Sequence, residues 1–544
     1  MAIRSVLLVF VIIWFLIVEG SVMEEEEGDT VYAWRMIHRF SDEVKALRVS
    51  KKSEAAGNVS ATWWPEKRSM EYYQMLVNND SHKQKLKLGP KHHLLFPSQG
   101  SLTMPLGNDF GWLYYTWIDI GTPNVSYLVA LDTGSDLLWL PCDCVRCAPL
   151  SASNYNTLDR DMNEYNPSAS STSKQLPCSH WLCALGPNCN SSKQPCPYTI
   201  NYDTEDTSSS GLLVEDTIHL ASGRDDTLNT SVPASVILGC GMKQSGVYLD
   251  GTAPDGLMGL GLGEISVPSL LAKAGLVRNS FSMCFGMDDS GRIFFGDQGP
   301  TTQQSTSFMP SDGKYITYIV GVEACCIGNS FLQKTSFKAL VDSGTSFTLL
   351  PNEVYNIITK EFDRQVNATI YRFEGYPWKF CYKSSSQDLP KVPSVKLMFP
   401  LNNSFVVHNP VFVIYDGSQV VIGFCLAIQP ADEDIGIIGQ NFMTGYRMVF
   451  DRENMKLGWS RSNCQDLNDG KKMPRTPPNG TPSNPLPTNE QQSSPGGHAV
   501  APAVAGRAPS KPSGASIQLI SAWFCLLELL LQLLLLHLLV SVSW

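Results

Sequence analysis

The sequence predicts an all-β protein built from two related lobes, and three observations carry that prediction. Apolar runs of strand length alternate with turn residues along most of the chain, which contains 42 glycines. An Asp-Thr-Gly turn follows the apolar run Tyr127–Leu131, and an Asp-Ser-Gly turn follows a similar run, Ala339–Val341. A chain of 544 residues, 43% of them hydrophobic, is long enough to bury a substantial core. Each lobe is therefore expected to present one carboxylate to a shared cleft.

The N-terminal 100 residues are predicted to precede the first lobe. Residues 1–20 have the features of a secretory signal peptide, because Arg4 is followed by an apolar run that is short for a membrane span. Residues 21–100 are polar, rich in charge and without strand alternation. Two interpretations of this segment remain open. It is either a prosegment whose basic stretch covers an acidic cleft, or a flexible N-terminal extension.

The first lobe is expected to span residues 111–309. Tyr114–Ile120 alternates in polarity and ends at a turn, which predicts a hairpin that leads into the Asp132 strand. Residues 142–196 form an insertion dense in cysteine and rich in loop-forming residues. Farther along, Asn279–Cys284 and Gly291–Gly296 are predicted to be central strands near the junction of the lobes.

The second lobe is expected to span residues 310–464 and to repeat the Asp turn at Asp342. After Pro351, apolar residues recur with helical spacing at Val354, Ile357, Ile358 and Phe362. Because proline is favoured at the start of a helix, the segment Pro351–Phe362 is predicted to be a surface helix packed on this lobe.

The C-terminal region changes character after Cys464. Residues 465–516 are rich in Pro, Gly, Ser and Thr and predict a disordered stalk, and residues 517–544 form a Leu-rich tail. Small residues before this tail predict a glycolipid (GPI) anchor attached at Ser513 or Gly514. The alternative is a transmembrane helix, for which the length suffices. Polar residues interrupt the tail, however, and no Lys or Arg follows it. We therefore expect a protein held at the extracellular face of the plasma membrane.

The cysteine content indicates an oxidising compartment. The chain has 15 cysteines, and removal of the tail that contains Cys525 leaves 14, an even number suited to disulfides. The cysteines lack the paired spacing of structural zinc sites, and the nine histidines are scattered, so no metal is expected. Acceptor sequences for N-glycans occur at Asn58, Asn79, Asn124, Asn190, Asn229, Asn367, Asn402 and Asn479.

The two Asp turns predict a specific chemistry. Two carboxylates about 3 Å apart cannot both ionise, so they share one proton and titrate as a unit. The ionised member can take a proton from a water, and the protonated member can hydrogen-bond the carbonyl under attack. Such a pair hydrolyses an amide without a metal or cofactor. The supporting hydroxyl and glycine residues are expected to be Thr133, Gly134, Ser135, Ser343, Gly344 and Thr345. One Asp-x-Gly is ordinary turn chemistry, but two after matching apolar strands are far more specific.

Further segments extend the repeat and point to a family. Each Asp turn is matched by a later apolar-apolar-Gly segment, Asp255–Leu260 and Gly436–Gln440, and the chain closes with Tyr446–Asp451 and Leu457–Trp459. From Trp112 to Cys464 the sequence resembles the pepsin-like aspartic proteases, and more specifically the nepenthesin-like type of plants. The resemblance implies two six-stranded-barrel-like lobes with a cleft between them, and it implies that Asp132 and Asp342 are the catalytic pair.

The same resemblance assigns roles to residues around the cleft. Tyr202 matches the tyrosine of the flap, the hairpin that covers the cleft, although the loop Asp203–Ser208 departs from the family by lacking glycines. Trp139 matches a tryptophan near the flap, and its alternative role is plain core packing. The resemblance implies the disulfides Cys147–Cys240, Cys178–Cys196, Cys183–Cys189, Cys284–Cys464 and Cys381–Cys425. It leaves Cys142, Cys144 and the adjacent pair Cys325 and Cys326 open, the last as a vicinal bridge, two half-bridges or free thiols.

Two functions follow as expectations. The first is a monomeric aspartic endopeptidase that acts on a peptide or protein substrate and is held at the membrane by a lipid anchor. The second is a catalytically weak or inactive binding or inhibitor protein on the same fold, because fold does not determine activity. The presence of both aspartates favours the enzyme. A net charge of −10 argues against nucleic-acid binding.

Overall fold

The structure is a computed structural model, and it describes residues 69–70, 73–74, 89–105, 113–155, 158, 161–183, 189–202, 206–222, 231–288, 290–310, 317–374, 376–384, 391–408, 410–416, 420–431 and 433–465. The chain divides into two units, Met1–Gln84 and Lys85–Trp544, and all that follows concerns the second. The signal peptide, most of the predicted prosegment, the stalk after Gln465 and the anchor signal lie outside the described residues. So do Asn58, Asn79, Asn229, Asn479, Ser513 and Gly514. Within the described part of the chain, no helix is both long and apolar enough to cross a membrane.

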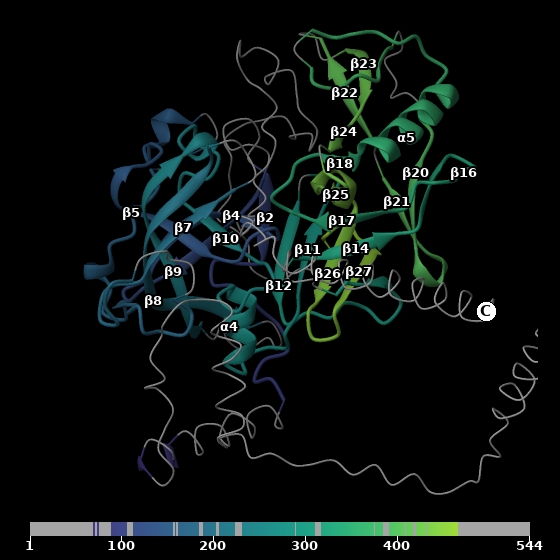
Figure 1. The fold of residues 1–544 in the computed structure, drawn as a ribbon. Helices are drawn as coiled ribbons and strands as arrows, with labels where there is room; N and C mark the ends of the chain where they lie inside the picture. Colours follow the sequence, from purple (N-terminus) through teal and green to yellow (C-terminus); the bar gives the residue numbers. More distant parts are fainter. Residues whose placement is uncertain are drawn as a thin grey trace, which may run out of the picture. The chain divides into compact units, whose positions relative to one another are not determined.

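Fifteen strands form one large sheet that includes the first lobe (Figure 1). Its strands are β1 (Leu95–Pro97), β2 (Leu102–Pro105), β3 (Tyr114–Ile120), β4 (Val125–Asp132), β5 (Leu138–Arg146), β6 (Lys174–Gln175), β7 (Pro197–Asn201), β8 (Ser208–Ser222), β9 (Ser231–Ser245), β10 (Leu257–Gly259), β11 (Phe281–Phe285), β12 (Gly291–Phe295), β13 (Gln304–Ser307), β26 (Tyr446–Asp451) and β27 (Lys456–Arg461). Their main order is β1-β8-β9-β5-β10-β4-β3-β2-β12-β11-β26-β27-β13, and β6 and β7 pair with β8.

Strand β4 delivers Asp132 to the interior of the first lobe. It is antiparallel to β3 and parallel to β10, with Gly259 in register with Asp132. Six consecutive residues of β4, from Tyr127 to Asp132, are buried. This explains why the strand is a continuous apolar run rather than an alternating one. The predicted hairpin at Tyr114–Ile120 is confirmed as β3 and β4.

Apart from β26 and β27, the strands of the second lobe form three smaller sheets. The first, in spatial order, contains β14 (Ile319–Val322), β17 (Phe337–Val341), β25 (Ile435–Ile438), β18 (Thr348–Pro351) and β24 (Ile428–Ala431). The second contains β16 (Ser330–Leu332), β15 (Ala324–Ile327), β20 (Val395–Phe399) and β21 (Asn403–Val407). The third contains β19 (Cys381–Lys383), β23 (Val421–Leu426) and β22 (Val411–Tyr415). β17 ends one residue before Asp342 and is parallel to β25, as β4 is parallel to β10. The predicted all-β, bilobal fold is confirmed.

The described helices are few and short. They are α4 (Val267–Lys273), α5 (Asn352–Gln365), α6 (Gln440–Met443) and the 3₁₀ turns η2 (Ala152–Asn154), η3 (Pro167–Ala169), η4 (Gly246–Tyr248) and η5 (Pro400–Asn402). The helix predicted after Pro351 is confirmed as α5, which buries Val354, Ile358 and Phe362 along one face. Burial of an amphipathic face accounts for its stability better than helix propensity does.

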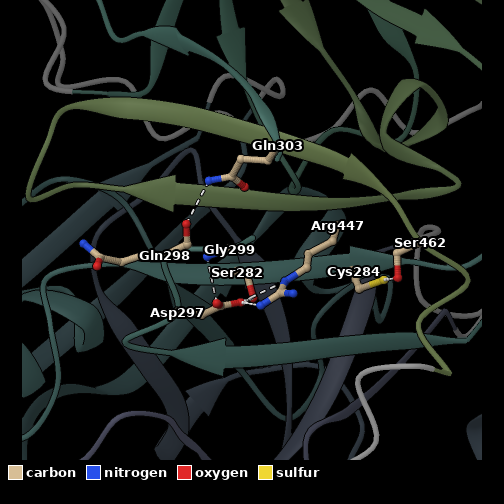
Figure 2. Close-up of polar contacts among 8 residues, drawn as sticks. All are labelled: Ser282, Cys284, Asp297, Gln298, Gly299, Gln303, Arg447 and Ser462. Carbon is tan, nitrogen blue, oxygen red and sulfur yellow. Dashed lines mark hydrogen bonds and ion pairs between the residues drawn. The ribbon is translucent and has the colours of Figure 1, made fainter. Parts of the chain in front are cut away.

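The strands predicted near the junction are confirmed as β11 and β12, which lie between β2 and the C-terminal strand β26 in the large sheet. β11 pairs with β12 on one side and with the C-terminal strand β26 on the other (Figure 1). Figure 2 shows Arg447 of β26 reaching Asp297, which also accepts a hydrogen bond from Ser282. Arg447 Nε lies 2.9 Å from Asp297 Oδ2, and both side chains are largely buried. Removing either partner would leave a buried charge without compensation.

Two predicted disulfides are confirmed. Cys284–Cys464 joins β11 to the end of the second lobe, and Cys381–Cys425 joins the paired strands β19 and β23. Cys325 and Cys326 are free thiols, one buried and one partly exposed. As neighbours in strand β15 their side chains point to opposite faces, which rules out a bridge between them there.

The prediction of Cys147–Cys240 is wrong. Cys142 bridges to Cys240 instead, and Cys144 bridges to Cys147. Strands β5 and β9 are parallel, with Leu140 in register with Cys240, so the buried Cys142 at the end of this pairing lies within reach. The intervening Asp143 has a φ of 44° and lies at the irregularity of β5 that separates the two bridges.

The predictions of Cys178–Cys196 and Cys183–Cys189 are also wrong. The structure has Cys178–Cys189 and Cys183–Cys196. Pro177 and Pro195 form an isolated antiparallel β-bridge. On either side of it, Cys178 N donates to Gln194 O, and Cys196 N donates to Leu176 O. Cys178 and Cys196 are therefore offset diagonally across the two segments. Diagonal neighbours are too far apart for a disulfide, so each binds a cysteine of the intervening loop.

Candidate active site

The two Asp loops are held together by exchanged hydrogen bonds. Thr133 N donates to Ser343 Oγ over 3.0 Å, and Ser343 N donates to Thr133 Oγ1 over 2.8 Å. Each hydroxyl also donates to a carbonyl of the opposite lobe, Thr133 to Val341 O at 3.0 Å and Ser343 to Leu131 O at 2.8 Å. The hydroxyls of these two supporting residues therefore bridge the loops, and each loop fixes the other.

Each carboxylate is oriented by its own loop in the same way. Gly134 N donates to Asp132 Oδ1 over 2.8 Å, and Gly344 N donates to Asp342 Oδ1 over the same distance. The outer oxygens accept from hydroxyls, Asp132 Oδ2 from Ser135 and Asp342 Oδ2 from Thr345, the latter at 2.5 Å. Both carboxylates are fully buried. These bonds hold the two carboxylate groups in equivalent orientations. The inner oxygen of each, Oδ1, has no hydroxyl donor from its own loop.

The inner oxygens of both carboxylates face one small space. A methyl group built on Gly134 would lie 2.9 Å from Asp342 Oδ1 and 3.1 Å from Asp132 Oδ1. One on Gly344 would lie 2.5 Å from Asp132 Oδ1 and 3.1 Å from Asp342 Oδ1. Only glycine leaves both oxygens this close to the backbone. The two carboxylates, far apart in sequence, are therefore brought to a common point.

This crowding changes the acidity of the pair. Burial, followed by the negative charge of Asp342, raises the pKa of Asp132 well above its usual range. Burial likewise raises the pKa of Asp342. Two buried carboxyls facing one another retain a proton between them, because a second negative charge there is unfavourable. The site therefore offers one acid and one base at the same place.

Aromatic residues close the first-lobe side of this site. Trp139 Nε1 donates to Tyr202 Oη over 2.9 Å, and both side chains are buried. After burial itself, the charge of Asp132 is the next cause that raises the pKa of Tyr202, so the tyrosine lies close to the pair. Tyr202 and Trp139 are thus placed together. The loop residues 203–205 between Tyr202 and the start of β8 lie outside the described residues.

Sequence reasoning assigned no role in the site to three residues that contact it. Gln440 Nε2 donates to Ser343 O, and Asn441 N donates to Ser346 O, so the start of α6 supports the Asp342 loop. Their position directly after the Ile-Ile-Gly segment of β25 was a signal that could have found them. Tyr248 packs edge-on against Tyr202, with ring centroids 4.9 Å apart. No sequence pattern marks this tyrosine.

Other predicted sites lie on the surface or in disulfides. Four glycan acceptors, Asn124, Asn190, Asn367 and Asn402, are exposed. The groupings of potential metal ligands among the described residues consist of oxidised cysteines together with Asp143. A sulfur in a disulfide is not available as a thiolate ligand, so these groupings do not amount to a metal centre.

The two lobes, the parallel strands beneath each Asp loop and the bridged loops define a pepsin-like aspartic protease fold. Profiles described as xylanase inhibitor N-terminal and xylanase inhibitor C-terminal match residues 114–297 and 320–461. The crystal structure of Basic 7S globulin from soybean superposes with a TM-score of 0.54, covering 71% of this chain and all of that one. At 17% identity this likeness shows the fold alone.

Two relatives from Arabidopsis thaliana are similar over nearly the whole chain. "Aspartic proteinase-like protein 1" is 56% identical over 526 residues, which cover 95% of this chain and 96% of the relative. "Aspartyl protease family protein 1" is 40% identical over 467 residues, which cover 84% and 86% respectively. The chain belongs to the pepsin-like aspartic protease family.

Proposed function

We propose that this protein is an aspartic endopeptidase that works in acid, with Asp132 and Asp342 as its catalytic pair. One observation carries the proposal: both carboxylates are buried, identically oriented and directed at one space by the exchanged bonds of Thr133 and Ser343. An arrangement of this kind, maintained from both lobes, supplies a general acid and a general base without a cofactor.

In this mechanism the carboxylate pair holds one proton and one water. The ionised member takes a proton from the water as its oxygen attacks the peptide carbonyl, and the protonated member donates to the carbonyl oxygen. Because the pair is symmetric in its hydrogen bonds, the proton belongs to both residues. An extended peptide is expected to bind by strand-like backbone hydrogen bonds, with Tyr202 covering it.

A second function is a binding or inhibitor protein on the same fold. The inhibitor descriptions of the matching profiles and the words "proteinase-like" in one relative's name favour it. The binding hypothesis predicts that the protein keeps its function when Asp132 and Asp342 are substituted. The enzyme hypothesis predicts the opposite, which makes the two separable by substitution.

The test is hydrolysis of a denatured protein by the full secreted chain between pH 3 and 7, with and without pepstatin. We expect acid cleavage that pepstatin blocks and that Asp132→Asn and Asp342→Asn each abolish. Asp288→Asn, at a surface turn, is the matched control and should cleave like the parent. A folded parent chain that cleaves nothing at any pH would support the binding function instead.

We further propose that the protein is a monomer held at the extracellular face of the plasma membrane by a glycolipid. This rests on the order of small residues, spacer and apolar tail in residues 503–544. Phospholipase C specific for phosphatidylinositol should release the protein from cells, and the Ser513→Trp/Gly514→Trp double variant should no longer be anchored. Retention of the parent on membranes after lipase treatment would support a transmembrane helix.

A further inference from the structure

A short turn of the first lobe is bonded directly to the base of the flap. We name this turn, Ser245–Tyr248, the flap brace. Ser245 Oγ lies 2.7 Å from Ser208 Oγ, and Val247 N donates to Thr207 Oγ1 over 3.3 Å. Thr207 O in turn accepts from Tyr202 N over 2.9 Å. The brace is therefore one hydrogen-bonded step from the backbone of Tyr202, the tyrosine that lies close to the Asp pair.

The contact between the brace and the flap is tight at one backbone position. Gly246 has a φ of 58°, a conformation that side-chain-bearing residues rarely adopt. A methyl group there would lie 2.3 Å from Thr207 Oγ1 and 2.7 Å from Thr207 Cα. Because one of these atoms belongs to the backbone, the clash cannot be relieved by a rotamer change alone. The position of the flap base thus depends on a glycine at 246.

The last residue of the brace makes the second contact. The ring of Tyr248 packs edge-on against Tyr202, at 4.9 Å and 87°, and against Trp139, at 5.1 Å and 61°. Since Trp139 also hydrogen-bonds Tyr202, the three rings form a closed set around the flap tyrosine. Edge-to-face pairs are each worth about 0.5–1.5 kcal/mol beyond the area that they bury.

We infer that Gly246 and Tyr248 are positioning residues that hold Tyr202 in its place over the Asp pair. Tyr248 is fully buried by protein rings, so it has no free surface to offer as a pocket wall. The brace contacts the flap at two points, one at the hydroxyl and backbone of Thr207 and one at the ring of Tyr202. The effect of the brace on catalysis rests on the proposed peptidase function. The contacts between the brace and the flap do not depend on that function.

The test compares Gly246→Ala and Tyr248→Leu with Tyr127→Leu. Tyr127 is an equally buried ring of the first lobe that packs edge-on against Tyr165, away from the brace. We expect both brace variants to lose about 10- to 100-fold in kcat/KM per folded molecule, because small displacements of a positioning group have effects of that size. The pH profile should keep its shape, since the Asp pair is untouched. Tyr127→Leu should lower the Tm without changing kcat/KM.

Two further measurements make the inference falsifiable. Combining Tyr248→Leu with Tyr202→Phe should cost less than the sum of the single losses, since both changes act through one contact. Amide hydrogen exchange in residues 206–222 should accelerate in Gly246→Ala but not in Tyr127→Leu, whether or not the parent hydrolyses peptides. Additive losses, a changed preference among substrates, or unaltered exchange would overturn the brace. An inactive parent whose exchange still responds would overturn only the proposed function.

Discussion

The two Asp loops are supported alike, but what lies above them differs between the lobes. Above Asp132, Trp139 donates a hydrogen bond to Tyr202 of the flap. Beside Asp342, Phe347 packs edge-on against Trp378 at 4.9 Å. Trp378 Nε1 is buried with no hydrogen-bond acceptor among the described residues. The second lobe thus has a buried aromatic pair held by ring contact, and the first has a buried pair held by a hydrogen bond.

This difference separates two requirements of the site. Sharing a proton requires two carboxylates in equivalent settings, and the paired bonds of Gly134 and Gly344 provide that equivalence. In the proposed mechanism, covering a substrate requires one element near the pair, and we assign that role to Tyr202 of the first lobe. Substitution of either aspartate should therefore remove the activity, whereas substitutions around Tyr202 should lower the activity by degrees.

The largest expected effect tests the symmetry of the pair. Asp132→Asn and Asp342→Asn should each lower kcat by about 10³-fold or more, because either removes the shared proton chemistry. The two losses should agree within a factor of ten. Single-turnover hydrolysis of one peptide by both variants measures this. A variant that keeps a tenth of the parent rate would show that only the other aspartate is needed.

Disulfides provide the next comparison between the lobes. Cys142–Cys240 closes a loop of 98 residues in the first lobe, and Cys381–Cys425 closes one of 44 in the second. In the chain-entropy model the double Cys→Ser variants should lose about 4.7 and 4.0 kcal/mol of unfolding free energy. Because the dependence on loop length is logarithmic, the two costs should differ by less than about 1 kcal/mol. Urea unfolding of both variants gives the answer, and a difference of several kcal/mol would contradict it.

Substitution of the bridging hydroxyls has a smaller expected effect. Thr133→Val and Ser343→Ala each remove a hydroxyl that donates and accepts a hydrogen bond between the buried loops. Each substitution should lower the unfolding free energy of the protein by about 1–3 kcal/mol. Because the two hydroxyls serve one bonded unit, the double variant should cost less than the sum. Thermal unfolding of the three variants measures the coupling. Strict additivity would mean that the loops are held independently.

The smallest effect is the dependence of stability on pH. Folding raises the pKa of Asp132, so its contribution to stability is complete below the unfolded value near 3.8 and is lost as pH rises through the folded value. In Asp132→Asn the uncharged amide replaces the protonated acid, so the gap between variant and parent should shift in favour of the variant as pH rises. Asp255 of the first lobe serves as the comparison, because burial also raises its pKa but no second carboxylate contributes to that shift. Tm curves that stay parallel from pH 3 to 7 would contradict the shift.

The sequence was informative where a pattern repeats and uninformative where geometry decides. The Asp turns, the apolar strands that lead into them and α5 were predictable, because each leaves a local signature of apolar period and turn residues. The partners of Cys178 and Cys240 were not, because they depend on strand register, which a single sequence does not reveal. Tyr248 was equally hidden, since its role arises from the side chains that meet it in space.

The pairing of β26 with β11 has a consequence for biosynthesis. The neighbour of β11 in the finished sheet is a strand from the last part of the second lobe, residues Tyr446–Asp451. The first lobe therefore cannot complete its sheet as it leaves the ribosome, although N-terminal domains commonly fold first. The edge of β11 therefore stays unpaired until the C-terminal strands have been synthesised and Cys464 can form its disulfide with Cys284.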